Sequence, residues 1–181
     1  MDMYKLKFTI LQQEILQFLF IKAGMSFNER GIARQLKVSP TAVSNSLKVL
    51  EKEDIIKVSK DKESGRLAIE LNRENIRVFF LKRIENLRMI YESGLVEYLT
   101  ESFPAATIIL FGSYSFGEDT INSDIDIAII GSMEKEPNLQ KFDKILEREI
   151  SLQFYKNFRE IHKNLKENIL NGIILKGAVE L

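Results

Sequence analysis

Two aspartates, Asp124 and Asp126, are the residues of this chain best suited to chemistry, and they interrupt an apolar run. Strands disfavour aspartate, yet the isoleucines from Ile125 to Ile130 are typical of a buried strand. Residues two apart on a strand share one face, so we expect both carboxylates to point the same way. Paired carboxylates at the edge of a sheet suit Mg²⁺, with water and substrate phosphates completing its coordination. They are the minimum required for metal-assisted phosphoryl or nucleotidyl transfer.

The elements that would position these aspartates are a strand, a glycine turn, a short helix and a second strand. The pattern predicts a strand over residues 106–111, a turn at Gly112 and Ser113, a first helical turn over residues 114–117 and a strand over residues 123–130. Gly112 permits close backbone approach, and backbone amides at a helix start favour phosphate. The Ser113 hydroxyl would add a donor to the same oxygen.

The first part of the chain predicts three helices followed by a β-hairpin. Apolar residues recur at helical spacing from Leu11 to Leu19, and Asn28 is suited to cap a second helix. Ser39 and Pro40 predict the start of a third helix, which would run to about Asp54. The runs IIKVSK and RLAIEL alternate as strands do and are joined by DKESG. This order predicts a helix-turn-helix with a wing.

The outer face of the third helix and the tip of the wing are candidate DNA contacts. Short hydroxyls and amides reach base edges in a major groove, whereas lysines suit phosphates. The candidate residues on the helix are Thr41, Ser44, Asn45, Lys48 and Lys52, and those at the wing are Lys60, Lys62 and Arg66. Such a polar face is also typical of any solvated helix, and winged helices serve as protein-binding modules too, so a structural or protein-contact role stays open.

Charge and composition agree with this division. Residues 1–72 carry 12 Lys and Arg against 9 Asp and Glu, whereas residues 103–181 carry 9 against 12. The basic end is therefore the candidate for nucleic acid. The chain has no cysteine, which excludes a disulfide framework and thiolate chemistry. The absence of cysteine also predicts a reducing cytoplasm as the location. Glutamines and a glutamate interrupt the apolar N-terminal segment, so we expect neither a signal peptide nor a membrane span.

Residues 73–103 contain no proline and one glycine, which predicts either one long connecting helix or two helices broken near Ser93 and Gly94. Their apolar surface is wider than one stripe requires. It could pack on both domains of one chain or on a second copy. A homodimer would suit a DNA-reading protein, because paired helix-turn-helix units match paired half-sites.

Two family resemblances follow from these motifs. Residues 8–71 resemble the winged helix-turn-helix domains of prokaryotic transcription regulators. Gly112-Ser113 followed by SDIDIAI resembles the motif of the nucleotidyltransferase superfamily, most closely the minimal nucleotidyltransferases of archaea and bacteria. The second resemblance implies that Asp124 and Asp126 hold Mg²⁺ or Mn²⁺, which bridges a nucleoside triphosphate substrate. It also implies that Gly112 and Ser113 hold the outgoing phosphates.

The chain departs from the superfamily pattern at two positions. The third carboxylate of the family falls on the run Ile150-Ser151-Leu152, so Ser151 occupies that position, with Glu149 as a substitute or as a solvated strand-end residue. Phe116 stands where many members carry an arginine. We therefore expect an α+β chain of two domains: a winged helix over residues 1–72, a connecting helix over 73–103 and a small mixed-sheet nucleotidyltransferase fold over 104–181.

Two functions remain open on the sequence alone. The protein is either an enzyme that transfers a nucleoside monophosphate to an acceptor hydroxyl, with a second protein as a possible partner or acceptor, or a DNA-binding regulator whose C-terminal domain senses nucleotide or a partner without turnover. An acid close to Asp124 and Asp126 would favour the enzyme, whereas Ser151 in that place, with Glu149 facing solvent, would favour the regulator.

Overall fold

The structure is a computed structural model that describes residues 8–60 and 67–179. The chain divides into two compact units, Met1–Val78 and Phe79–Leu181. None of the described helices is long and apolar enough to cross a membrane.

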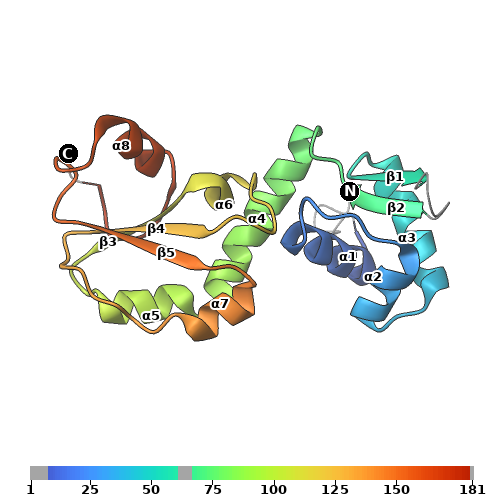
Figure 1. The fold of residues 1–181 in the computed structure, drawn as a ribbon, viewed down its shortest axis with the longest axis horizontal. Coiled ribbons are helices and arrows are strands. Elements are labelled where there is room, and N and C mark those ends of the chain that lie inside the picture. Colours follow the sequence, from blue (N-terminus) through green and yellow to red (C-terminus); the bar gives the residue numbers. More distant parts are fainter. Residues whose placement is uncertain (1–7, 61–66, 180–181) are drawn as a thin grey trace, which may run out of the picture. The chain divides into compact units, whose positions relative to one another are not determined.

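The described residues of the N-terminal unit form three helices, a two-stranded antiparallel hairpin and the start of α4 (Ile76–Glu92) (Figure 1). The elements are α1 (Ile10–Ile21), α2 (Glu29–Leu36), α3 (Pro40–Lys52), β1 (Ile56–Lys60) and β2 (Leu67–Leu71). Phe27 and Ile69 exchange backbone hydrogen bonds of 2.8 and 2.7 Å, so the segment before α2 is fixed to the hairpin. The predicted three helices and hairpin are confirmed.

Local sequence signals set the ends of these helices. The Asn28 side chain accepts from the Gly31 amide at 2.8 Å and caps α2. The Ser39 hydroxyl accepts from the Ala42 amide at 3.2 Å, and Pro40 occupies the first position of α3. The core of the unit consists of fully buried apolar side chains from all three helices and the hairpin. They include Ile15, Leu19, Ile32, Val43, Leu50, Ile55 and Ile69.

The C-terminal unit is built on a mixed four-stranded sheet in the order β5-β4-β3-β6. Its elements are α4 (Ile76–Glu92), α5 (Leu95–Ser102), β3 (Thr107–Phe111), α6 (Gly112–Phe116), β4 (Ile125–Ile130), α7 (Gln140–Leu146), β5 (Ile150–Tyr155), α8 (Lys163–Leu170) and β6 (Ile173–Lys176). β3 pairs antiparallel with β4 and β6, whereas β4 and β5 are parallel. The mixed sheet expected for this half is therefore present.

Apolar side chains cover both faces of this sheet. On one face Ile125, Ile127 and Ile129 pack with buried residues of α5 and α7. On the other face Ala128 and Ile130 pack with Ile169 of α8 and its neighbours. Figure 1 shows α5 and α7 on one side of the strands and α8 on the opposite side. Because β4 is buried on both faces, it is continuously apolar apart from Asp126.

The segment predicted as a connecting helix forms two helices, α4 and α5, separated at Ser93 and Gly94. The first residues of α4 belong to the N-terminal unit and the remainder to the C-terminal unit. Within the C-terminal unit, Gly117 packs directly on α4. A Cβ atom at Gly117 would lie 2.4 Å from the Phe79 carbonyl oxygen, and φ is +76° there. Only glycine fits such a position without strain.

Candidate functional site

Asp126 lies on β4 directly opposite Phe111 of β3, the residue that precedes the glycine turn. The turn comes so close that a Cβ atom at Gly112 would lie 2.6 Å from Asp126 Oδ2, and Gly112 has a φ of +72°. Glycine is thus required both for the backbone conformation and for the space that the carboxylate occupies. Partial burial, and then the charge of Asp124, raise the pKa of Asp126 above its usual value.

Asp124 is not on the strand, because β4 begins at Ile125. The prediction that both aspartates belong to one strand was wrong in this respect: the strand begins two residues after the predicted start at Ser123, and Asp124 is exposed just before it. The two carboxylates still interact, since the Asp124 charge contributes to the pKa shift of Asp126. The helix after the turn also differs slightly, since α6 begins at Gly112 and ends at Phe116.

Ser151 lies next to Asp126 on the neighbouring strand β5. In the parallel pairing of β4 with β5, Ser151 is the direct partner of Asp126. Paired residues of neighbouring strands project from the same face of the sheet. The neighbour of the Asp126 carboxylate on β5 is therefore a hydroxyl, as the sequence motif predicted.

Glu149 lies just before β5, where its carbonyl oxygen accepts from the Ile125 amide at 2.8 Å, and its side chain is exposed. Within residues 8–60 and 67–179, no group of three or more acidic or histidine side chains is placed so that it could hold a metal ion. Asp124 and Glu149 nevertheless line one open hollow of about 560 Å³. Its other lining residues are Ile121, Asn122, Ser123, Asp143, Lys144, Glu147 and Arg148.

A buried ionic cluster, which sequence reasoning missed, supports the loop that leads to Asp124. Asp119 is 1% exposed and forms ion pairs with Lys82 of α4 and, at 3.5 Å, with Arg148. Asn86 donates to Asp119 Oδ1 at 2.7 Å and to the Tyr114 carbonyl at 2.9 Å. Burial, followed by the charge of Asp119, raises the pKa of Tyr114. The one signal in the sequence is that Lys82 and Asn86 interrupt the apolar positions of the predicted connecting helix.

The candidate DNA contacts on α3 lie opposite its buried face. Val43, Leu47 and Leu50 are buried, as predicted. Thr41, Asn45, Lys48 and Lys52 are exposed, and Ser44 is half-buried. Lys60 ends β1 and is exposed, whereas Lys62 and Arg66 lie outside the described residues. The outer face of α3 thus carries hydroxyl, amide and ammonium groups along one side of a capped helix.

Two family models match the chain, one in each unit. Residues 14–58 match the family described as "Bacterial regulatory protein, arsR family", and residues 92–176 match "Nucleotidyltransferase domain". Both resemblances drawn from the sequence are confirmed. The chain combines a winged helix-turn-helix region with a nucleotidyltransferase-fold region. The comparison with curated proteins finds no significant match.

Several solved structures are weakly similar to this chain. The adhesin competence repressor AdcR of Streptococcus pyogenes is 20% identical with a TM-score of 0.43, and the match covers 56% of this chain and 72% of AdcR. Wild-type ZitR of Lactococcus lactis in complex with DNA is 22% identical with a TM-score of 0.41, covering 57% of this chain and 67% of ZitR. MepR of S. aureus in its DNA complex is 22% identical with a TM-score of 0.40, and the match covers 54% of this chain and 80% of MepR. These TM-scores add nothing to what the family models show.

Proposed function

We propose that this protein is a DNA-binding transcription regulator whose C-terminal domain binds a nucleoside triphosphate with Mg²⁺ or Mn²⁺ and uses it as a signal rather than as a substrate. The observation that carries the proposal is the outer face of α3. It presents Thr41, Asn45 and Lys48 to solvent on a helix capped by Ser39, in the unit that matches a bacterial regulator family.

Double-stranded DNA is the partner that fits this face. Asn45 is suited to hydrogen-bond a base edge in the major groove, and Lys48 and Lys52 are suited to phosphates on either side of it. The residue types on α3 thus combine base reading with backbone contact, which sequence-specific binding requires. A protein-contact role for the same helix would not need this combination.

Asp124 and Asp126 fit a metal ion that arrives with the nucleotide. Mg²⁺ is commonly bound by one or two carboxylates together with substrate phosphates, which is what an aspartate pair without a third acid supplies. The raised pKa of Asp126 is consistent with a carboxylate held beside a second negative charge in the absence of a cation. When bound, Mg²⁺ would neutralise phosphate charge at this edge of the sheet, with Gly112 and Ser113 next to the phosphates.

Ser151 is the reason for proposing a signal rather than turnover. A neutral hydroxyl beside Asp126 leaves the site one negative charge short of the superfamily pattern. Catalytic groups that act as a set lose most of their rate when one member is replaced. Binding tolerates such a replacement better than catalysis does, because the nucleotide's own phosphates also coordinate the metal.

Nucleotidyl transfer is the second candidate, and the shared hollow of Asp124 and Glu149 favours it. In that reaction an acceptor hydroxyl oxygen bonds to the α-phosphorus, the bond from that phosphorus to the pyrophosphate oxygen breaks, and the hydroxyl proton passes to solvent. Glu149 would then approach the aspartates to act as the third carboxylate. The exposed position of Glu149 makes this the weaker candidate.

A homodimer is also part of the proposal. Phe80, Ile84 and Tyr91 lie along α4 at intervals of helical turns and are 57%, 68% and 44% exposed. Apolar side chains that recur in this way on one helix face suit packing against another helix. A second copy would supply that helix and would place two α3 helices on one DNA molecule.

The proposed DNA binding is tested by selecting sequences from a random double-stranded library and measuring their affinity by fluorescence anisotropy. The wild-type chain should enrich a defined sequence, Asn45→Ala should relax the base preference, and Lys48→Ala should weaken all duplexes alike. If no sequence is enriched and the wild type and both variants bind with identical affinities, the proposed role as a DNA-binding regulator is contradicted.

A further inference from the structure

We propose that Arg30 and Arg34 of α2 form a second DNA-binding surface, which binds a backbone phosphate beside the wing. The inference rests on the proposed DNA binding and adds a contact outside α3 and the wing tip. The contact from α2 would position α3 on the duplex, and α3 itself would read the bases.

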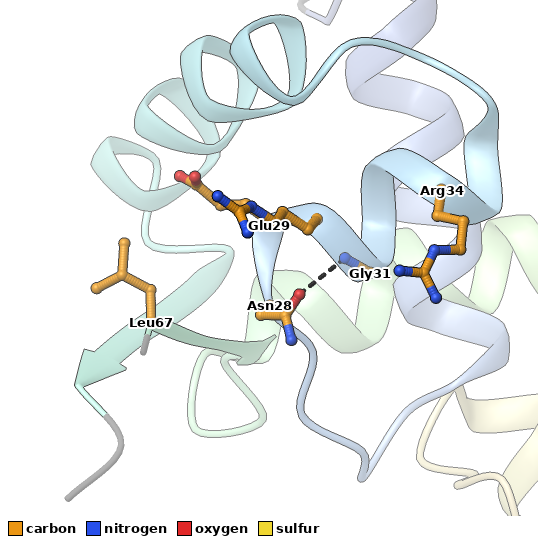
Figure 2. Close-up of a pocket in the computed structure, with 6 residues that line it drawn as sticks. Asn28, Glu29, Gly31, Arg34 and Leu67 are labelled. Carbon is orange, nitrogen blue, oxygen red and sulfur yellow. Dashed lines mark hydrogen bonds between the residues drawn. The ribbon is translucent and has the colours of Figure 1, made fainter. Parts of the chain in front are cut away.

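The surface borders a hollow of about 520 Å³ between α2 and the base of the wing. Figure 2 shows its lining, which comprises Asn28, Glu29, Arg30, Gly31, Arg34 and Leu67. Leu67 is the first residue of β2, the strand that leaves the wing. The backbone hydrogen bonds between Phe27 and Ile69 connect β2 to the segment before α2, so the two sides of the hollow are fixed relative to each other.

Arg30 and Arg34 are four residues apart on α2, so they project from the same side of the helix. Both side chains are exposed. Among the residues that the structure describes, neither side chain has a hydrogen-bond or ion-pair partner, whereas the Arg77 side chain pairs with Glu53. A guanidinium presents several hydrogen-bond donors in a rigid fork that matches phosphate oxygens. Two arginine side chains without other partners are therefore suited to bind a phosphate.

The other polar groups of the hollow leave its charge positive. The Asn28 side chain accepts from the Gly31 amide at 2.8 Å and is thereby occupied, as the dashed line in Figure 2 shows. The Glu29 carboxylate points to the side away from Arg34 (Figure 2). The charged lining is therefore two arginines against one glutamate. An anion is favoured over a cation or an apolar ligand.

A DNA phosphate is the anion that fits the place of the hollow in the fold. In helix-turn-helix proteins the second helix of the motif enters the major groove while the first crosses the backbone. α2 precedes α3 in this chain, and the wing lies on the other side of the hollow. A strand of DNA bound along α3 would bring its phosphates past both walls.

The test measures affinity for the selected operator and for a scrambled duplex over a series of salt concentrations. The double variant Arg30→Gln/Arg34→Gln is compared with the wild type and with Arg159→Gln, which removes an exposed arginine from the C-terminal unit. The double variant should weaken binding to both duplexes about tenfold or more, and each phosphate that it no longer neutralises should reduce the slope of log K against log salt by about 1. Arg159→Gln should change neither.

Three outcomes would overturn the inference, and they separate it from the proposed function. If the double variant behaves like Arg159→Gln while Lys48→Ala still weakens binding, the α2 surface is not a DNA contact. The proposed DNA binding through α3 is then unaffected. If the double variant changes base preference but not the salt slope, the arginines read bases rather than phosphate. If the wild type itself binds neither duplex, both proposals fail together. Circular dichroism melting of each variant confirms that the fold is retained.

Discussion

Asp126 is held where ionisation is unfavourable, between the backbone of Gly112 and the charge of Asp124. Because its pKa in the folded chain lies above the value in an unfolded chain, the folded state holds the proton more tightly. The ionised carboxylate therefore destabilises the fold, and this penalty grows as pH rises from below the unfolded pKa through the folded one. Such a penalty is expected where a carboxylate is kept for binding rather than for stability.

We predict that Asp126→Asn raises the melting temperature by a few degrees near about pH 7 and has no such effect near about pH 3. The reason is that the amide removes a partly buried charge and its repulsion from Asp124. Calorimetric melting at the two pH values measures the effect. Asp143→Asn is a control of the same chemistry outside the pair, and an unchanged or lower melting temperature of Asp126→Asn near neutral pH would contradict this account.

Ser151 is predicted to limit metal binding. Ser151→Asp places a third carboxylate next to Asp126 in the β4–β5 register, so its affinity for Mg²⁺ with a nucleoside triphosphate should rise about tenfold. Isothermal titration calorimetry compares the affinity of Ser151→Asp with that of Ser151→Asn, whose side chain has a volume similar to that of aspartate but no charge. Equal affinities of the two variants would show that residue 151 does not reach the metal.

Glu149 gives the complementary prediction. Since its side chain is exposed at the entrance of β5, Glu149→Gln should leave metal–nucleotide affinity within a factor of about two. A large decrease of affinity in the same calorimetric titration would mean that Glu149 closes onto the aspartates, which would favour the enzyme.

At the scale of elements, the segment between α6 and β4 is fastened to α4. Lys82 and Asn86 of α4 contact Asp119, and Gly117 lies against the backbone of α4. The same helix begins in the N-terminal unit, where Arg77 pairs with Glu53 at the end of α3. α4 is thus bonded within the C-terminal unit to the loop before Asp124 and within the N-terminal unit to the C-terminal end of α3.

We predict that Asp119→Asn destabilises the C-terminal unit by about 3–5 kcal/mol, because it removes the negative partner of two buried cations. Lys82→Met with Asp119→Leu should recover part of that stability, since only one buried cation, Arg148, is then left without the carboxylate instead of two. Urea unfolding followed by circular dichroism measures both, with the exposed Lys141→Met as control. A destabilisation no larger than that of the control would mean that the cluster is not structurally important.

At the scale of the whole molecule, the sequence allowed the two regions and their order to be predicted because their signals are local. Caps such as Asn28 and Ser39, alternating strands and the Gly112-Ser113 turn act over a few residues. The start of β4 was predicted at residue 123, two residues too early, because hydrophobic periodicity does not mark where strand pairing starts. The Lys82–Asp119–Arg148 cluster joins residues far apart in the chain, and the polar residues Lys82 and Asn86 on an apolar helix face do not by themselves identify their partner.

The exposed apolar face of α4 predicts that the protein is a dimer in solution. Phe80→Glu with Ile84→Glu should yield a monomer of unchanged helix content, since both side chains are exposed in one copy. Light scattering after size exclusion measures the mass, and Lys141→Glu is the control for added negative charge. A wild-type mass equal to that of one chain at micromolar concentration would contradict the dimer.

The most direct test of the regulator measures operator affinity with and without Mg²⁺ and ATP, while pyrophosphate is assayed in the same samples. We predict that the nucleotide changes operator affinity by about fivefold or more, that Asp124→Asn/Asp126→Asn abolishes the change, and that no pyrophosphate accumulates. Pyrophosphate release that depends on the two aspartates, with operator affinity unchanged by nucleotide, would contradict the signal role and establish nucleotidyl transfer instead.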